Sequence, residues 1–302
     1  MIGNLFNLKQ LEAFVWVADL GSFRKAAQHL NTTQPNISAR IAGLEQVLGV
    51  VLMQRDAGSV RMTEQGRAVL QEARGVLRSA EALVETAQRV DLIADRLRLG
   101  VTELIASTWL PDYLRRLKAA YPGVAVELTV DLSRNLDEGL EQNALDLAIQ
   151  NAPFGNRATG SVALGQFGYA WVAEAKIAAT LKRRCSVAEL IPHSIITHAR
   201  HTQAYDELAA YAAANGLATE RIVPCNSLSF CPQMALDGLG VALLPSALLN
   251  RSEAGKRLVV LDVDWLPSPL RFAARFHRER AARMVEQAAG LAADVSAAHD
   301  AD

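Results

Sequence analysis

The sequence is poor in cysteine, in long apolar runs and in excess charge of one sign. Its 302 residues include 3 cysteines, and this odd, sparse set (Cys185, Cys225 and Cys231) fits a reducing compartment better than a disulfide framework. No apolar run approaches the roughly 20 residues of a membrane-spanning helix, and the first ten residues, MIGNLFNLKQ, lack the pattern of a secretory signal. We therefore expect a cytoplasmic protein that does not contact a membrane.

The charge balance limits how one copy of the chain could bind nucleic acid. The formal net charge is −1, and the first 66 residues hold six basic and five acidic side chains. Non-specific affinity for DNA grows with the number of phosphates neutralised, so one copy of this segment should bind DNA feebly. If it binds DNA, several copies must act together. Half of the residues are apolar, which is enough for two or three packed domains.

Residues 21–49, GSFRKAAQHLNTTQPNISARIAGLEQVLG, read as two short helices joined by a tight turn. Ser22 and Thr33 are expected to cap the two helices, Pro35 suits a first turn, and Gly49 is expected to end the second helix. Apolar residues at helical spacing predict one buried stripe on each helix: Phe23, Ala26, Ala27 and Leu30 on the first, and Ile37, Ile41, Leu44 and Leu48 on the second.

The face of the second helix opposite its stripe carries small side chains. It holds Pro35, Asn36, Ala39, Ala42, Gly43 and Gln46, with Ser38 and Arg40 at its flanks. Such a face suits a helix whose backbone lies close to another surface, and the major groove of DNA is one such surface. The alternative is a helix pair packed inside an ordinary all-α domain.

A long helix with a heptad pattern is expected after a short hairpin. Gly58 permits the hairpin turn within VLMQRDAGSVRMT, and Thr63 is expected to cap the helix that follows. Steps of four and three residues relate its apolar positions: Val69, Ala73, Val76, Ala80, Leu83, Ala87 and Val90, continued by Ala94 and Leu97. This spacing predicts a coiled coil and a dimer. The alternative is a linker helix packed on its own chain.

From about residue 97 the pattern alternates short β-type runs with helical segments. LRLGV, VAVELTV and LDLAI predict a parallel sheet of a first α/β lobe, and YAWVA, HSIIT, RIVPC and VALLP predict a second lobe. The last strand, LRFAARF, and the last helix, RERAARMVEQAAGLAADV, are expected to return to the first lobe.

With these parts in this order, the chain resembles the LysR-type transcriptional regulators over essentially its whole length. The resemblance rests on LKQLEAFVWVADLGSFRKAAQHLNTTQPNISARIAGLEQVLGVVLMQR, on MTEQG, and on LDLAI and DGLGVALLP. It implies a winged helix-turn-helix at 1–62, a linker and dimerisation helix at 63–95, and a two-lobed periplasmic-binding-protein-like effector domain at 96–302. Lobe I is expected at about 96–164 and 268–302, and lobe II at about 165–267.

The resemblance also implies partners and DNA-contacting residues. It predicts a sequence-specific regulator, a dimer or tetramer, that binds double-stranded promoter DNA, responds to a small-molecule effector and has RNA polymerase as a candidate partner. The predicted DNA contacts are Thr33, Gln34, Pro35, Asn36, Ser38, Arg40, Arg55 and Arg61. The chain departs from the family pattern at Ala39, where many members have arginine, and in the wing near Gly58 and Ser59, where another basic residue is common. Both departures remove charge from the DNA-binding face.

Polar residues that follow the predicted strands are the candidates for effector binding, because ligands of α/β lobes gather at the carboxyl ends of strands. They are Thr102, Glu103, Ser133, Asn151, Thr197, His198, Asn226 and Ser227. By resemblance, Thr102, Ser133, Asn151 and Thr197 fall where family members contact effectors. Each could instead cap a helix. For Glu103 the two alternatives are a cap of its own helix and a ligand contact that disfavours carboxylates.

No catalytic motif and no metal-ligand spacing stands out, so neither an enzyme activity nor a cofactor is expected. The competing class is a solute-binding or enzymatic α/β protein with an accessory helical domain, which the coiled-coil pattern disfavours. A third hypothesis is a regulator that senses oxidants through Cys225 and Cys231. Neither thiol has an adjacent basic residue to stabilise a thiolate, so inert buried thiols are the simpler expectation.

Overall fold

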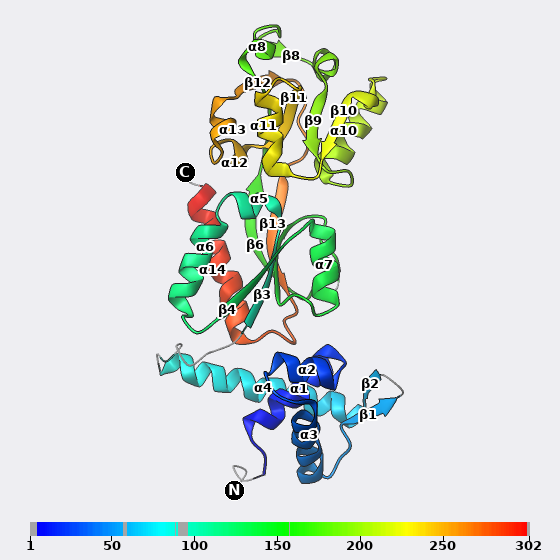
Figure 1. Cartoon of the computed structure of the whole chain (residues 1–302), viewed down its shortest axis with the longest axis vertical. Helices are drawn as coiled ribbons and strands as arrows, with labels where there is room; N and C mark the ends of the chain where they lie inside the picture. Colours follow the sequence, from blue (N-terminus) through cyan, green and yellow to red (C-terminus); the bar gives the residue numbers. More distant parts are fainter. Residues whose placement is uncertain (1–4, 57–58, 88, 90–95, 157, 301–302) are drawn as a thin grey trace.

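The structure is a computed structural model that describes residues 5–56, 59–87, 89, 96–156 and 158–300. A helical N-terminal domain, a first α/β lobe and a second α/β lobe follow one another along the long axis of the molecule (Figure 1). This architecture confirms the predicted fold class. None of the helices in the described ranges has the length and apolar character needed to cross a membrane.

The N-terminal domain consists of α1 (Leu8–Leu20), α2 (Phe23–His29), α3 (Gln34–Leu48), and the antiparallel hairpin of β1 (Met53–Asp56) and β2 (Ser59–Met62). The Ser22 hydroxyl accepts a hydrogen bond from Lys25 N at 3.3 Å, as expected of a helix cap. Thr33 stands at the N-cap position of α3, but its side chain makes no capping bond. Gly49 ends α3 with φ +68°, a left-handed conformation that glycine adopts readily. The predicted hairpin turn at Gly58 lies outside the described residues.

The predicted stripes form the core of this domain, with two corrections. Phe23, Ala26, Ala27, Ile37, Ile41 and Leu44 are buried, and Leu30 packs against the same cluster. Leu48 was expected in the stripe but is 37% exposed, because it ends the last turn of α3 beyond the end of the core. Gly43 was expected on the open face, yet a Cβ there would lie 2.9 Å from Gln10 Nε2, so this position faces α1.

The long helix α4 (Glu64–Thr86) begins at the predicted cap, where Gly66 N donates to Thr63 Oγ1 at 2.8 Å. Its first half packs on its own chain, because Leu70 and Ala73 are buried in the N-terminal core. Farther along, Val76 is 43% and Leu83 71% exposed. The expected continuation of the heptad to Leu97 is wrong, since Leu97 is a buried residue of strand β3. Val90 and Ala94 lie outside the described residues.

Lobe I is a five-stranded sheet in the order β4-β3-β5-β13-β6. The predicted parallel part is present, since β3 (Arg96–Val101) pairs in parallel with β4 (Ala125–Val130) and β5 (Leu147–Asn151). The returning strand β13 (Leu270–Phe276) pairs antiparallel with β5 and β6 (Gly160–Phe167). The helices of this lobe are α5 (Glu103–Ser107), α6 (Leu110–Ala120), α7 (Ser133–Glu141) and α14 (Arg283–Asp300).

Lobe II is a six-stranded sheet in the order β10-β9-β11-β7-β12-β8. Its strands are β7 (Tyr169–Ala173), β8 (Arg184–Cys185), β9 (Ile195–His198), β10 (Ile222–Cys225), β11 (Val241–Pro245) and β12 (Val259–Val263). Its helices are α8 (Ala175–Ala178), α9 (Val187–Leu190), η3 (Ile191–His193), α10 (Gln203–Ala214), η4 (Thr219–Arg221), η5 (Leu228–Phe230), α11 (Cys231–Leu236), α12 (Ser246–Leu249) and α13 (Glu253–Arg257).

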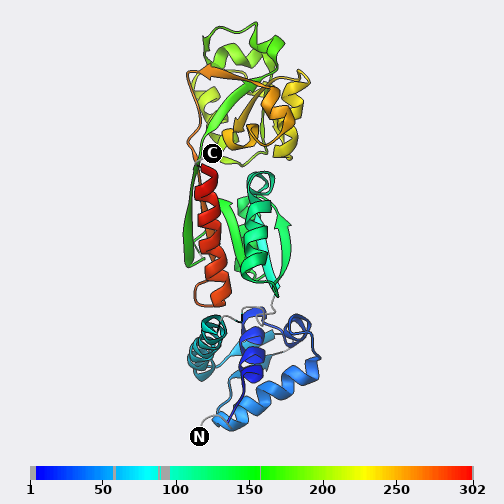
Figure 2. The same cartoon turned by 90° about the vertical axis from the view of Figure 1, so that its left-hand side faces the viewer.

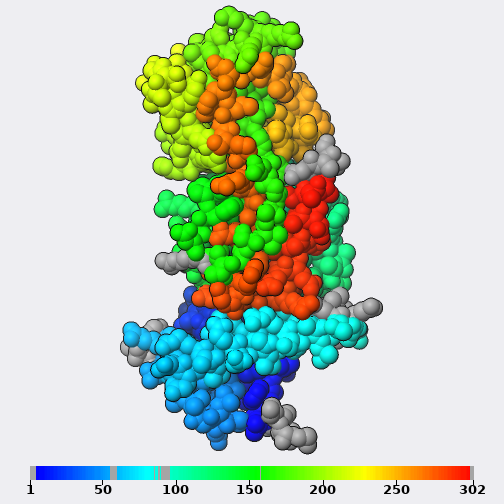
Figure 3. All heavy atoms as spheres, turned by 180° about the vertical axis from the view of Figure 1, so that it is seen from behind, coloured from blue at the N-terminus to red at the C-terminus, as the bar shows by residue number. Residues whose placement is uncertain are grey.

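The chain crosses between the lobes twice, from β6 to β7 and from β12 to β13. The paired strands β6 and β13 run side by side along one face of lobe I, as Figures 2 and 3 show from two directions. Strand β6 was not predicted. Its buried positions do not alternate, so the period that marks a half-buried strand is missing from its sequence.

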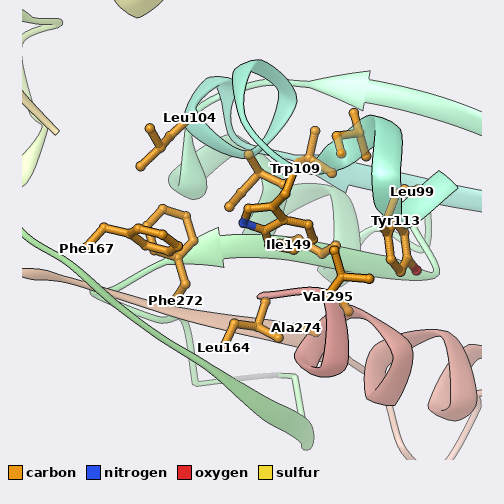
Figure 4. Close-up of a cluster of buried hydrophobic side chains, with 14 of the residues drawn as sticks. Leu99, Leu104, Trp109, Tyr113, Ile149, Leu164, Phe167, Phe272, Ala274 and Val295 are labelled. Atoms are coloured by element: carbon orange, nitrogen blue, oxygen red, sulfur yellow. The ribbon is translucent and has the colours of Figure 1, made fainter. Parts of the chain in front are cut away.

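One apolar cluster extends through both lobes. On the lobe I side, Trp109 and Ile149 lie near Val295 of α14, and Phe167 and Phe272 pack edge-to-face near Leu104 of α5 (Figure 4). Leu228, Cys231, Ala242 and Leu244 of lobe II belong to the same cluster. The two lobes therefore share a core, whereas the N-terminal domain has one of its own.

The N-terminal domain meets lobe I through polar contacts. Asn143 Nδ2 donates to Asp19 O at 2.6 Å, and Arg280 Nη1 donates to Asn143 Oδ1 at 2.6 Å. The Arg98 guanidinium lies 6.0 Å from the ring centroid of Trp16, which in turn stacks on His29 at 3.6 Å. These contacts set the position of α1 and α2 against lobe I.

Candidate functional site

The start of α3 is an open, weakly charged helix surface. Thr33, Gln34, Pro35 and Asn36 are exposed, and Asn36 Nδ2 donates to Thr32 Oγ1 at 2.8 Å. Ala39 and Ala42 are exposed one and two turns farther on. With short side chains at these positions, the backbone of α3 can approach another surface closely.

Ser38 and Arg40 lie at the flanks of this surface and are half-buried. Arg40 is close enough to Glu12 of α1 to lower the pKa of that carboxyl, although burial outweighs this and leaves the pKa of Glu12 raised. Arg61 is exposed on β2. Arg55 lies on β1, and its side chain is outside the described part of the structure.

The second predicted site lies where the lobes meet, and Glu103 is at its centre. Its carboxylate accepts hydrogen bonds from Leu228 N at 2.7 Å and Ser229 N at 3.0 Å. The hydroxyls of Ser229 and Ser227 donate to it at 2.7 and 3.2 Å. Glu103 therefore contacts lobe II, and the expectation that it caps its own helix α5 is wrong, because its oxygens bind N–H groups about 125 residues away in the sequence.

These hydrogen bonds shift the titration of Glu103. Burial alone would raise its pKa, but the N–H and hydroxyl donors of residues 227–229 outweigh burial and hold the pKa below its usual range. His198 Nε2 lies 3.9 Å from Glu103 Oε2, too far for a hydrogen bond. Burial lowers the pKa of His198 despite that carboxylate, which keeps the imidazole neutral at pH 7.

The hydroxyls of two buried threonines near this contact make no hydrogen bond with the described residues. Thr102 precedes Glu103, and Thr197 precedes His198; they are 6% and 0% exposed. Neither hydroxyl oxygen, nor His198 Nε2, has a hydrogen-bond partner among the described residues. Buried polar groups of this kind are uncommon and need an explanation, such as a bound ligand or water.

The remaining predicted residues behave differently. Ser133 and Asn151 bond to each other, since Ser133 Oγ donates to Asn151 Oδ1 at 3.0 Å and Asn151 N donates to Ser133 Oγ at 3.1 Å. Asn226 and Ser227 are exposed after β10. The structure thus gathers Glu103, His198 and Ser227 at one contact, with Thr102 and Thr197 adjacent in sequence, and joins Ser133 and Asn151 as a separate pair.

Sequence reasoning missed the lobe II partners of Glu103, which are the N–H groups of Leu228 and Ser229. The only signal was the polar run NSLS before a helix, typical of an N-terminal cap.

Sequence reasoning also missed Asp137, whose carboxylate accepts hydrogen bonds from Gln150 Nε2 at 2.6 Å and Gly155 N at 2.8 Å. A shallow cavity of about 190 Å³ lies beside Asp137, and it contains none of the predicted residues.

The two cysteines considered as a redox pair lie near this contact. The thiols of Cys225 and Cys231 both donate to Ser227 O, at 3.3 Å each. Burial strongly raises the pKa of Cys231, which disfavours its thiolate. No group of three or more potential metal ligands occurs among the residues that the structure describes.

Comparison with protein families gives two matches that together span most of the chain. Residues 8–67 match the family described as "Bacterial regulatory helix-turn-helix protein, lysR family", and residues 91–295 match the "LysR substrate binding domain". A protein of Streptomyces viridosporus named "Probable hydrogen peroxide-inducible genes activator" is 30% identical over 293 residues, which cover 93% of this chain and 90% of that protein. The "SDS degradation transcriptional activation protein" of a Pseudomonas strain is 37% identical over 144 residues, and this match spans 47% of each protein.

Solved structures show the same fold. A full-length OxyR variant from Pseudomonas aeruginosa superposes with a TM-score of 0.61 at 22% identity, over 96% of this chain and 97% of that one. Full-length CbnR, solved as a complex with its target DNA, gives a TM-score of 0.53 at 19% identity, over 96% of this chain and 100% of that one. At this identity the likeness concerns the fold.

Proposed function

The chain belongs to the LysR family of transcriptional regulators, and from that premise we propose which of its surfaces bind DNA, a second copy and an effector. It is a DNA-binding regulator with an effector-binding domain. We assign 1–62 to DNA binding, 63–95 to the linker and dimerisation helix, and 96–302 to effector binding. Lobe I comprises about 96–164 and 268–302, and lobe II about 165–267. The protein acts in the cytoplasm without enzymatic activity, and RNA polymerase is its candidate partner at promoters.

We assign recognition of promoter DNA to the exposed start of α3 and to the wing. The contacting residues are Thr33, Gln34, Pro35, Asn36, Ser38, Arg40, Arg55 and Arg61. The observation that carries this assignment is the open face of α3, where Pro35, Ala39 and Ala42 are exposed and short enough for close approach. Gln34 and Asn36 are exposed on the same face and offer amide groups for hydrogen bonds. Because the domain carries little net charge, shape and dimer geometry supply much of the selectivity.

The test is operator binding by Arg40→Ala, measured by gel shift on the DNA upstream of the chain's own gene. Loss of a base contact should weaken binding by about 1–3 kcal/mol, and loss of a phosphate contact should lower the salt slope by about one. Arg183→Ala, which removes an exposed arginine of lobe II, is the matched control. Unchanged binding at every salt concentration would remove Arg40 from the interface.

We assign self-association to the exposed part of α4 and to strand β4. Val76 and Leu83 are large apolar residues that the chain leaves in solvent. All six residues of β4 are exposed, and this strand is at the edge of the sheet, with Val126, Leu128 and Val130 between 38% and 47% exposed. Two such surfaces fit a dimer or, if both are used, a tetramer. Self-association supplies the DNA affinity that one weakly charged domain lacks.

The corresponding test is Leu83→Glu, which would place like charges across a paired α4. The dimer and DNA binding should weaken together, as followed by light scattering and gel shift. Leu239→Glu is the control, because Leu239 is 60% exposed in lobe II. A variant that stays dimeric and binds DNA normally would exclude α4 as a necessary interface.

We assign effector binding to the region between the lobes. The residues concerned are Thr102, Glu103, Ser133, Asn151, Thr197, His198, Asn226 and Ser227. The unpartnered hydroxyls of Thr102 and Thr197 support this assignment, since a hydroxylated or amine-bearing ligand would satisfy them. A thermal-shift screen of metabolites, repeated with Thr197→Val, tests it: a stabilising compound should lose its effect in the variant.

A further inference from the structure

Glu103 links the two lobes through its carboxylate. The side chain starts at the first residue of α5 in lobe I and reaches the first turn of η5 in lobe II. Four donors, two backbone N–H groups and two serine hydroxyls, bind its two oxygens at 2.7–3.2 Å. Hydrogen bonds to an ionised acceptor are the strong class, and here they join segments that belong to different sheets.

The lobe II side of the contact is built to accept an anion. Helix η5 passes directly into α11, so Leu228 N and Ser229 N lie at the start of a nine-residue helical stretch that runs to Leu236 and have no acceptor within that stretch. Such N–H groups carry partial positive charge. The Glu103 carboxylate, which belongs to the same chain, accepts hydrogen bonds from both of these N–H groups.

The surroundings of Glu103 offer little other compensation for its charge. Among the described residues, the ionisable groups that interact with it are His198 of β9 and the thiol of Cys231. His198 is kept neutral by burial, and Glu103 raises the pKa of Cys231 further. A second carboxylate at this position would therefore meet one negative charge and no cation, which is costly in a partly buried site.

We propose that Glu103 is an interlobe latch: its carboxylate holds lobes I and II together in the absence of an effector and closes the N–H groups of residues 228–229 to free carboxylates. The proposal rests on the assignment of the interlobe region to effector binding and adds how that region is held when empty. An effector must then act beside the latch through uncharged or cationic groups, or displace Glu103.

The test compares full-length wild type with Glu103→Ala and Glu103→Gln by hydrogen exchange of the 228–236 segment and by thermal unfolding. In Glu103→Ala the amides of Leu228 and Ser229 should exchange at least about tenfold faster, the factor that corresponds to one charge-assisted hydrogen bond. Glu103→Gln keeps the side-chain size and loses the charge, so a smaller increase is expected. Glu253→Ala, which removes an exposed acid of lobe II, should change nothing in this segment.

Chemical rescue separates the latch from a general loss of packing. Sodium acetate or formate, compared with sodium chloride at equal ionic strength, should restore slow exchange and melting temperature in Glu103→Ala, because a free carboxylate refills the vacated space. Wild type and Glu103→Gln should not respond. Protection of residues 228–236 that is unchanged in both variants, or acetate stabilising wild type as much as Glu103→Ala, would overturn the proposal.

These measurements use no DNA and no effector. If Glu103→Ala does not fold, Glu103→Gln still decides the outcome by exchange of the same amides. Failure of the wild type to bind promoter DNA would overturn the proposed function and leave the latch unaffected. Normal DNA binding with unchanged exchange in the variants would do the reverse.

Discussion

The interface between lobes I and II and the interface between the N-terminal domain and lobe I are made of different kinds of contact. We call them the apolar joint and the polar joint. Lobes I and II share one apolar cluster, in which Leu104 and Phe272 of lobe I and Leu228 of lobe II take part. The N-terminal domain has a separate core and meets lobe I through Asn143 and through the stacked Trp16, His29 and Arg98.

Because of this difference, mutations should affect the stability of the two joints differently. Apolar burial gains free energy in proportion to area, so the lobes should unfold as one unit. Polar contacts exchange protein partners for water and yield little net free energy, so the N-terminal domain can leave lobe I at small cost. A domain that must adjust to DNA benefits from the second kind of joint.

The largest effect is expected from Leu104→Ala in the core that lobes I and II share. Leu104 is 3% exposed, and its truncation should lower the free energy of unfolding of both lobes by about 3 kcal/mol. Calorimetry or urea titration should show the lobes destabilised together and the N-terminal domain unaffected. Leu239→Ala at an exposed site is the control. Destabilisation of lobe I alone would show that the lobes are independent.

A smaller effect is expected at the polar joint from Asn143→Gly. Asn143 has φ +55°, which glycine adopts without strain, so the change removes the bonds to Asp19 and Arg280 and leaves the backbone intact. Docking should weaken by about 1 kcal/mol. Hydrogen exchange should rise around the end of α1, while the cores of both domains keep their protection. Asn135→Ala, on the exposed side of α7, is the comparison; equal effects would refute a docking role.

A pH dependence is also expected at the interface between the N-terminal domain and lobe I. Burial and the nearby Arg98 lower the pKa of His29 to about 4, with Asp146 opposing and Arg96 adding to the shift. Because the folded state favours neutral His29, its stabilising contribution is complete above pH 6.5 and is lost as the pH falls toward 4. Urea titrations between pH 7 and 4.5 should show a smaller loss of stability for His29→Gln than for wild type. Parallel pH profiles would contradict this.

The sequence pattern predicted those features that depend on interactions between residues close together in the chain. The stripes of α2 and α3, the caps at Ser22 and Thr63 and the end at Gly49 all follow from contacts within a few residues. The parallel pairing of the first strands of lobe I was predicted, because strands that alternate with helices form parallel sheets. The missing strand β6 gains its place from pairing with β13, about 110 residues later, which no local period encodes.

The candidate site was predicted as residue types and not as contacts. Polar residues after strands marked Glu103, His198 and Ser227 correctly as neighbours in space. The sequence did not show which donors bind Glu103, because the first turn of its own helix and the first turn of the lobe II helix both have backbone N–H groups without a partner in their helix. The heptad on α4 failed at Leu97 for a similar reason: an apolar residue fits a helix seam and a buried strand equally well.

Strand β4 has a consequence for how the protein must be made. Its edge presents Val126, Leu128 and Val130 to solvent, and an ion pair at 3.3 Å joins Glu127 of this strand to Arg96 of β3. Open apolar edges invite strand-to-strand aggregation. The pairing with a second copy that we propose for β4 would cover this edge. Overproduction of lobe I variants that cannot pair should yield insoluble protein even when their fold is intact.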